Sequence, residues 1–177
     1  MPIIDPRRSI LVVVDFQARL MPAIHDAATA IANARRLLDA AAMLDIPVVF
    51  TEQNPTGLGP TVPELVVPGR PVVPKMTFDA VRAPGFLDRV PGDRAAVVTG
   101  CEAHVCVGQT VLGLLATGRA VHVVRDAVGS RRPESKETAL ARMARHGAEI
   151  VTTEMVVFEW LETAEHPRFR EVARLIR

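Results

Sequence analysis

The chain has 177 residues, of which 49% are hydrophobic and 23% charged, so it can form one domain with a substantial core. Its formal net charge is +1 and it has no long basic run, which argues against binding to nucleic acid or to an anionic membrane surface. Its longest apolar stretches fall far short of the roughly 20 residues that a transmembrane helix needs.

Buried strands and amphipathic helices alternate along the chain. Short apolar runs rich in Val and Ile predict strands, and apolar residues at helical spacing predict helices. The predicted strands are 9–15, 46–52, 71–75, 94–100, 119–127 and 148–153. The predicted helices are 26–44 with Asp26 as its N-cap, 106–118, 133–147 and 165–177. This order predicts an α/β fold with a parallel sheet between two helical layers, in a single domain over residues 1–177.

The segment 53–71 is rich in Pro and Gly and predicts a long loop, with one helical turn near Val62–Leu65. Loops of this length inside compact domains are usually functional. The N-terminal sequence MPIIDPRRSILVVVDF does not resemble a signal peptide. Because the chain also has only two cysteines, we expect a reducing, cytoplasmic location and no disulfide.

Ligands of open parallel sheets bind beyond the carboxyl ends of the strands, so the residues there are the candidates for function. These residues are Asp15, Glu52, Lys75, Gly100 to Glu102, and Asp126. Lys75 and Lys136 are the only lysines among 21 basic residues. A lysine at a strand end therefore draws notice, since a compact ammonium can be desolvated beside a nucleophile in a way that guanidinium cannot.

Cys106 is predicted at a helix start, six residues after Gly100. Free backbone N–H groups and the helix dipole at such a position favour the reactive thiolate. Each residue alone has a simpler explanation: Asp15 could cap a turn, Lys75 could be a solvated strand end, and Cys106 a small buried hydrophobe. Their meeting at one edge of the predicted sheet favours shared chemistry over these three explanations together.

Other kinds of site find less support in the sequence. Zinc needs about four N, S or O ligands, and the five histidines show no paired spacing, so we expect no metal. No phosphate-binding glycine loop and no serine nucleophile motif is present, and we expect no cofactor.

The segments VVVDFQ, VPKMTFDAV and TGCEAHVCVGQTVLGLLATGRAVHVVRDAVGSR resemble the isochorismatase-like cysteine hydrolase superfamily, over nearly the whole chain. TEQNPTGLGPTVPEL and FEWLETAEHPRFREVARLI more narrowly resemble the isochorismatase-domain-containing subgroup. This resemblance implies a six-stranded parallel sheet in the order 3-2-1-4-5-6, flanked by helices. It also implies a catalytic triad in which Asp15 is the general base, Lys75 stabilises the ion pair and Cys106 is the nucleophile.

The resemblance further implies a non-proline cis peptide bond between Cys101 and Glu102. The backbone N–H groups of Glu102 and Cys106 would then form the oxyanion hole. The implied reaction is hydrolysis of a small amide-like C–N substrate through a thioester intermediate. We expect the pocket to include three loop residues: Gln17, Gln53 and Leu58.

Departures from the superfamily narrow the expected substrate. Nicotinamidases of this superfamily bind a metal through histidines after the second strand, and this segment has none. True isochorismatases need no thiol nucleophile, so the full triad points to amide-like hydrolysis.

Two alternatives stay open: a non-catalytic binding protein that retains the fold, and a thiol redox protein in which Cys101 resolves an oxidised Cys106. As partners we expect a small-molecule substrate and further copies of the chain in a homo-oligomer, with no nucleic acid and no membrane.

Overall fold

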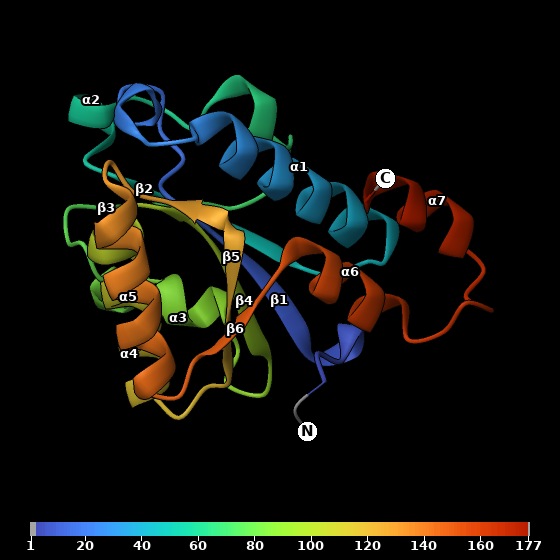
Figure 1. Cartoon of the computed structure of the whole chain (residues 1–177). Helices are drawn as coiled ribbons and strands as arrows, with labels where there is room; N and C mark the ends of the chain where they lie inside the picture. Colours follow the sequence, from blue (N-terminus) through green and yellow to red (C-terminus); the bar gives the residue numbers. More distant parts are fainter. Residues whose placement is uncertain (1–2, 177) are drawn as a thin grey trace.

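The computed structural model describes residues 3–176, which form one six-stranded sheet in the order β3-β2-β1-β4-β5-β6 (Figure 1). The strands are β1 (Ser9–Val14), β2 (Val48–Gln53), β3 (Val72–Lys75), β4 (Ala95–Cys101), β5 (Val121–Gly129) and β6 (Glu149–Val151). All five neighbouring pairs are parallel. The predicted fold class and strand order are therefore confirmed.

Helices cover both faces of the sheet, which explains why β1 is buried along its whole length. One layer holds α1 (Ala27–Met43), α6 (Thr153–Leu161) and α7 (Phe169–Ala173); the other holds α3 (Phe86–Arg89), α4 (Gly108–Ala116) and α5 (Pro133–Arg145) (Figure 1). Successive side chains of β1 enter opposite cores: Leu11 and Val13 face one layer, and Val12 and Val14 face the other. We call these the α1 core and the α4 core. No helix within residues 3–176 is long and apolar enough to cross a membrane.

The Pro/Gly-rich segment after β2 is a loop that contains two short helices. They are α2 (Pro55–Leu58) and a 3-10 turn (Pro63–Leu65), which lies where the sequence predicted a helical turn. Other 3-10 turns are Pro6–Arg8, Met21–Ala23, Ala80–Arg82 and Arg174–Ile176. An isolated antiparallel bridge between Gln17 and Thr61 holds the loop against the end of β1.

Helix α6 was not predicted from the sequence, and the last helix is shorter than predicted. Thr152, predicted inside the last strand, is instead the N-cap of α6, and its hydroxyl accepts a hydrogen bond from the Met155 N–H at 3.3 Å. The predicted helix 165–177 begins only at Phe169, and residue 177 lies outside the described residues. Asp26 occupies the N-cap position of α1, but its carboxylate accepts from the Thr29 hydroxyl rather than from a backbone N–H.

A register shift lengthens β5 beyond its predicted end. Val98 of β4 pairs with Val123, whereas Gly100 pairs with Val128, so β5 contributes three extra residues between these two pairs. As a result Gly129, and not Asp126, lies opposite Cys101 at the carboxyl end of β4. The expectation that Asp126 ends a strand is therefore wrong.

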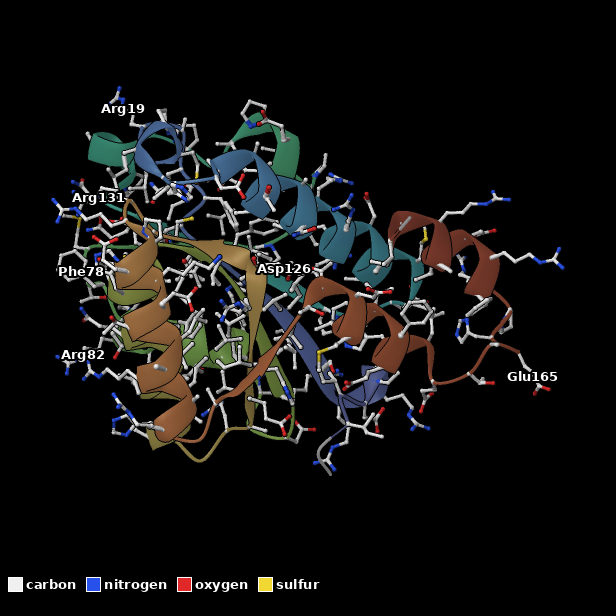
Figure 2. The ribbon with its side chains drawn as sticks, in the orientation of Figure 1. Arg19, Phe78, Arg82, Asp126, Arg131 and Glu165 are labelled. Carbon is white, nitrogen blue, oxygen red and sulfur yellow. The ribbon has the colours of Figure 1, made fainter. Side chains whose placement is uncertain are left out.

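Asp126 has a different task, inside β5. Its carboxylate accepts from the Thr153 backbone N–H at 2.8 Å and from the Thr153 hydroxyl at 2.9 Å, which fixes the start of α6. Figure 2 shows Asp126 toward the middle of the molecule and Arg131, which follows β5, at its edge.

Candidate functional site

A buried ion pair joins the carboxyl ends of β1 and β3. The Lys75 ammonium donates to the Asp15 carboxylate at 2.6 Å, and neither side chain has exposed surface. Thr51, on the intervening strand β2, donates its hydroxyl proton to the other Asp15 oxygen at 2.6 Å. Lys75 also donates to the backbone carbonyls of Thr77 and Phe78, each at 3.2 Å. This full set of partners compensates two buried charges that would be costly to leave unpaired.

Cys106 lies beside this pair, in a π-helical turn (Ala103–Val107) that connects β4 to α4. Its side chain belongs to the α4 core and the residue is only 7% exposed. Burial raises the pKa of the Cys106 thiol to about 12, and the negative charge of Asp15 adds to the rise while Lys75 opposes it. The thiol is therefore protonated at neutral pH in the resting protein.

The sequence favoured a thiolate at this position, and that expectation is wrong for the resting state. It placed Cys106 at the start of a helix, but Cys106 is buried in the π-helical turn and α4 begins only at Gly108. Burial disfavours the charged thiolate and is the largest cause of the raised pKa of the Cys106 thiol. A base is needed to take the proton, and the Asp15 carboxylate is the neighbouring group that can accept it.

The backbone takes an unusual conformation at Gly100, near the end of β4, and turns after Glu102 toward Cys106. Gly100 has φ of +145°, and a Cβ there would lie 2.2 Å from the Val14 carbonyl oxygen, so only glycine fits. The peptide bond between Cys101 and Glu102 is cis. The Glu102 carbonyl accepts hydrogen bonds from the N–H groups of Val105 and Val107, at 3.0 and 3.2 Å, and so begins the turn that carries Cys106.

Cys101 lies in a different environment from Cys106. Its side chain is fully buried in the α1 core, on the opposite face of the sheet from the α4 core. Burial raises the pKa of the Cys101 thiol as well, and both cysteines are free. A disulfide between them would require one side chain to leave its core.

Gln17, predicted to line the pocket, fastens the loop. The residue is fully buried; its amide donates to the carbonyls of Gln53 at 3.0 Å and Gly59 at 2.7 Å, and accepts from the Gln53 N–H at 2.8 Å. The Gln53 side chain donates to the Met76 carbonyl at 3.0 Å. Leu58 is half-buried in α2. Contact of these three side chains with substrate stays a prediction.

Thr51 is a site residue that the sequence analysis missed in favour of its neighbour Glu52. Successive strand residues face opposite sides of a sheet. Thr51 faces Asp15, whereas the Glu52 carboxylate accepts from the N–H and hydroxyl of Thr61, at 2.7 and 2.8 Å. Alternation alone would not have found Thr51, because Thr51 pairs with Val14 in the sheet and Asp15 turns its carboxylate toward Thr51 only by leaving the extended conformation, with φ of +51°.

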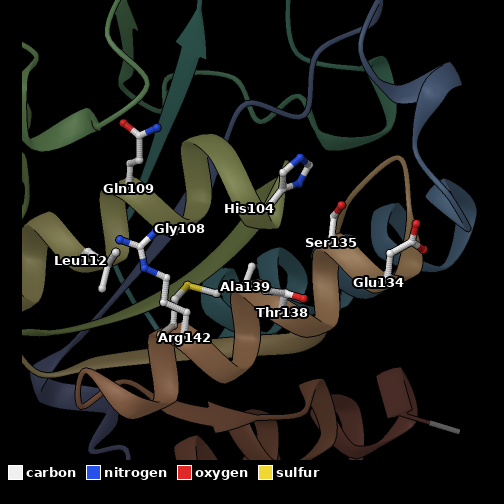
Figure 3. Close-up of a pocket in the computed structure, with 10 residues that line it drawn as sticks. His104, Gly108, Gln109, Leu112, Glu134, Ser135, Thr138, Ala139 and Arg142 are labelled. Carbon is white, nitrogen blue, oxygen red and sulfur yellow. The ribbon is translucent and has the colours of Figure 1, made fainter.

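A groove of about 370 Å³ runs between α4 and α5 (Figure 3). Its wall includes Arg142 of α5 together with His104 and Gly108, which lie two positions before and two positions after Cys106 in the sequence. Cys106 does not line it, because residues two positions away on a helical turn point to the opposite side. Among residues 3–176, no group of three or more His, Cys, Asp or Glu side chains could hold a metal ion.

Comparison with known proteins gives one family. The model of the isochorismatase domain matches residues 9–155. Isochorismatase domain-containing protein 1 of Danio rerio is 40% identical over 177 residues, which cover 98% of this chain. The chain spans only 62% of the length of that relative.

Two solved structures share the fold at high similarity. The MAR1 ribonuclease from Caenorhabditis elegans is 39% identical, with a TM-score of 0.93 and coverage of 98% of this chain and 91% of its own. YcaC of Escherichia coli is 26% identical, with a TM-score of 0.93 and coverage of 99% and 90%, and is described as an octameric hydrolase of unknown specificity.

Proposed function

Because the chain belongs to the isochorismatase family, we propose that it is a cysteine hydrolase acting on a small amide-like substrate. In this proposal Cys106 is the nucleophile, Asp15 the general base and Lys75 the charge stabiliser. The family supports hydrolase activity in general. The observation that carries the specific proposal is the fully buried Asp15–Lys75 pair, whose charges act on the Cys106 thiol.

The first half of the reaction forms a thioester. The thiol proton moves to the Asp15 carboxylate as the Cys106 sulfur bonds to the substrate carbonyl carbon, and the carbonyl oxygen takes up the displaced electron pair. The backbone N–H groups of Glu102 and Cys106 donate to this oxyanion, as such pairs do in acyl transfer. Asp15 then returns the proton to the substrate nitrogen, the C–N bond breaks and the amine leaves.

The second half regenerates the thiol. Water attacks the thioester carbonyl and loses a proton to Asp15, the C–S bond breaks, and the acid product leaves while the sulfur is reprotonated. Lys75 has the same task in both halves. Its ammonium offsets the negative charge that passes between sulfur and carboxylate, so the site never holds an unpaired buried charge.

The size and assembly of the working enzyme form part of the proposal. We infer one hydrolase domain over residues 1–177, assembled into a homo-oligomer, in line with the octameric YcaC relative. The expected substrate is a small molecule. Because the Caenorhabditis relative is named a ribonuclease, the test also includes RNA as a substrate.

The test is a panel of small amides and related C–N compounds, with single-stranded RNA as a separate arm. We expect wild-type protein to release amine or ammonia from some of the small compounds, and Cys106→Ala to lose at least about a thousandfold of that rate. Cys101→Ala is the matched control and keeps the rate. Equal turnover by Cys106→Ala, or cleavage confined to RNA, contradicts the proposal.

A non-catalytic binding protein is the second candidate, favoured by the raised pKa of the Cys106 thiol. It predicts that Cys106 takes up no acyl group from an activated ester such as p-nitrophenyl acetate at any pH where the fold is intact. The thiol redox alternative draws no such support, because Cys101 and Cys106 lie in different cores.

A further inference from the structure

Two side-chain contacts join the segment after β5 to the turn that carries Cys106. The Glu102 carboxylate accepts two hydrogen bonds from Arg131, one from its backbone N–H at 2.8 Å and one from its guanidinium Nε at 3.1 Å. Nδ1 of His104 lies 3.0 Å from the hydroxyl oxygen of Ser130. Two separate pairs of residues, Arg131 with Glu102 and Ser130 with His104, therefore connect the segments 130–131 and 102–104.

The register shift in β5 brings these segments together. Because Gly129 lies opposite Cys101, the residues that follow each strand, Ser130 and Glu102, continue side by side. Without the three extra residues of β5, Asp126 would lie opposite Cys101, next to another carboxylate. The shift thus puts Gly129 where this acid would lie and brings Arg131, two residues further on, within reach of the Glu102 carboxylate.

Arg131 supplies what the Glu102 carboxylate needs in order to be buried. The Glu102 side chain is 7% exposed, whereas that of Arg131 is 61% exposed, so the guanidinium keeps its hydration while it satisfies the acid. Surface ion pairs add little stability, but a backbone N–H and a guanidinium N–H on one buried oxygen fix geometry well. With its carbonyl held by Val105 and Val107, Glu102 is anchored at both its side chain and its main chain.

We propose that Arg131 is a positioning residue that, through the Glu102 carboxylate, aims the Glu102 backbone N–H at the carbonyl oxygen under attack. This inference rests on the proposed function, which gives that N–H its role in the oxyanion hole. An oxyanion donor must lie about 2.7–3.1 Å from the developing charge, and removing one costs roughly a hundredfold to a thousandfold in rate. A loosened donor loses part of that factor.

The test compares two reactions of Cys106. In acylation by p-nitrophenyl acetate, sulfur bonds to the ester carbonyl carbon, an oxyanion forms, the C–O bond breaks and p-nitrophenolate leaves. In alkylation by iodoacetamide, sulfur displaces iodide from a saturated carbon and no oxyanion forms. Access and thiol ionisation affect both reactions, whereas the Glu102 N–H assists only the first.

We expect Arg131→Ala to slow acylation roughly tenfold while alkylation stays within about twofold of wild type. Arg131→Lys keeps a cation and the backbone hydrogen bond, so its acylation rate should lie between those of wild type and Arg131→Ala. The matched control is Arg125→Ala, which removes a half-exposed β5 arginine paired with Glu137 at 2.9 Å and should leave both rates unchanged.

The positioning role is overturned if the ratio of the two rates in Arg131→Ala is unchanged, whether both rates stay at the wild-type level or both fall equally. If Arg131→Ala shows no cooperative thermal unfolding, Glu102→Gln, which keeps the shape of the side chain but not its charge, takes its place with the same expectation. A wild-type protein that takes up no more acyl group than Cys106→Ala overturns the proposed function and this inference with it. Acylation at Cys106 with an unchanged ratio overturns only this inference.

Discussion

Cys101 and Cys106 are five residues apart in the sequence and lie on opposite faces of the sheet. Cys101 ends β4 and packs into the α1 core against Gly129. Cys106 lies in the π-helical turn within the α4 core, beside Asp15 and Lys75. Both are buried, and burial raises the pKa of both thiols.

The comparison separates burial from reactivity. If burial alone decided, the two thiols would be equally inert, since each is kept protonated by its surroundings. They differ in their hydrogen-bonding neighbours: the Cys106 thiol is within side-chain hydrogen-bond reach of a carboxylate, Asp15, and an ammonium, Lys75, whereas charged side chains act on Cys101 without a side-chain hydrogen bond. Under the proposed function, a cysteine with a high resting pKa can therefore still be reactive, provided that its base is already in place.

The largest effect should come from removing that base. Asp15→Asn should lower hydrolysis by about a hundredfold to ten-thousandfold, because no group then accepts the thiol proton during attack. The same variant should speed alkylation of Cys106 at pH 8, because the negative charge of Asp15 raises the pKa of the thiol and its loss lowers that pKa. Turnover and iodoacetamide rates, measured on the same preparation, check this opposite pair of changes.

The pH dependence of Cys106 alkylation tests the direction of these pKa changes independently. Alkylation of wild-type Cys106 should keep rising above pH 9, toward the pKa of about 12, and in Asp15→Asn the midpoint should move to lower pH. Lys75→Met should move it the other way, since the ammonium lowers the pKa. A wild-type midpoint near 8.5, that of a free thiol, would contradict the role given to burial.

The next effect is the order of labelling. Iodoacetamide added to the native protein should modify Cys106 at least about a hundredfold faster than Cys101, because reaching the α1 core requires the fold to open. Peptide mass spectrometry after timed quenching measures the two rates. In a denaturant that unfolds the chain the rates should become nearly equal, and persistence of the difference there would mean that it does not come from the fold.

Much of this arrangement could be predicted from sequence because continuous apolar runs mark strands buried on both faces. β1 and β4 were found in this way, and a parallel sheet then gathers Asp15, Lys75 and Cys106 at one edge. Helix α6 was missed since its segment, TEMVVFEWL, is mostly apolar, and periodicity alone does not distinguish such a buried helix from a strand.

The Arg131–Glu102 contact could not be predicted, because a register shift leaves no periodic signal. Counting from the start of β5 without the shift puts Asp126 at the site, as the sequence analysis did. The raised pKa of Cys106 was equally out of reach, since it depends on the depth of the thiol below the surface and on a charge 91 positions earlier, at Asp15. Sequence thus identified the chemical groups, whereas tertiary packing decided their protonation and support.

The smallest expected effect is on stability, where substitution of Cys101 should matter more than substitution of Cys106. Cys101→Ser places a hydroxyl in the apolar α1 core, where the Gly129 backbone is its hydrogen-bonding neighbour, and should lower the free energy of unfolding by about 1–3 kcal/mol, the range for burying a polar group in a protein. Cys106→Ser should unfold close to wild type, because its hydroxyl lies beside Asp15 and Lys75 and can pair with either. Urea titrations of both variants measure the difference.

Activity should follow the opposite order. Cys106→Ser should lose hydrolysis, since a serine hydroxyl is a far weaker nucleophile without a base matched to it, whereas Cys101→Ser should keep its rate at temperatures where it is folded. If Cys106→Ser were the less stable of the two, the Asp15–Lys75 pair would have to be packed around the sulfur itself rather than around a polar atom. The packing around Cys106 would then be specific for sulfur. Its role in stability could not be separated from its role in the reaction.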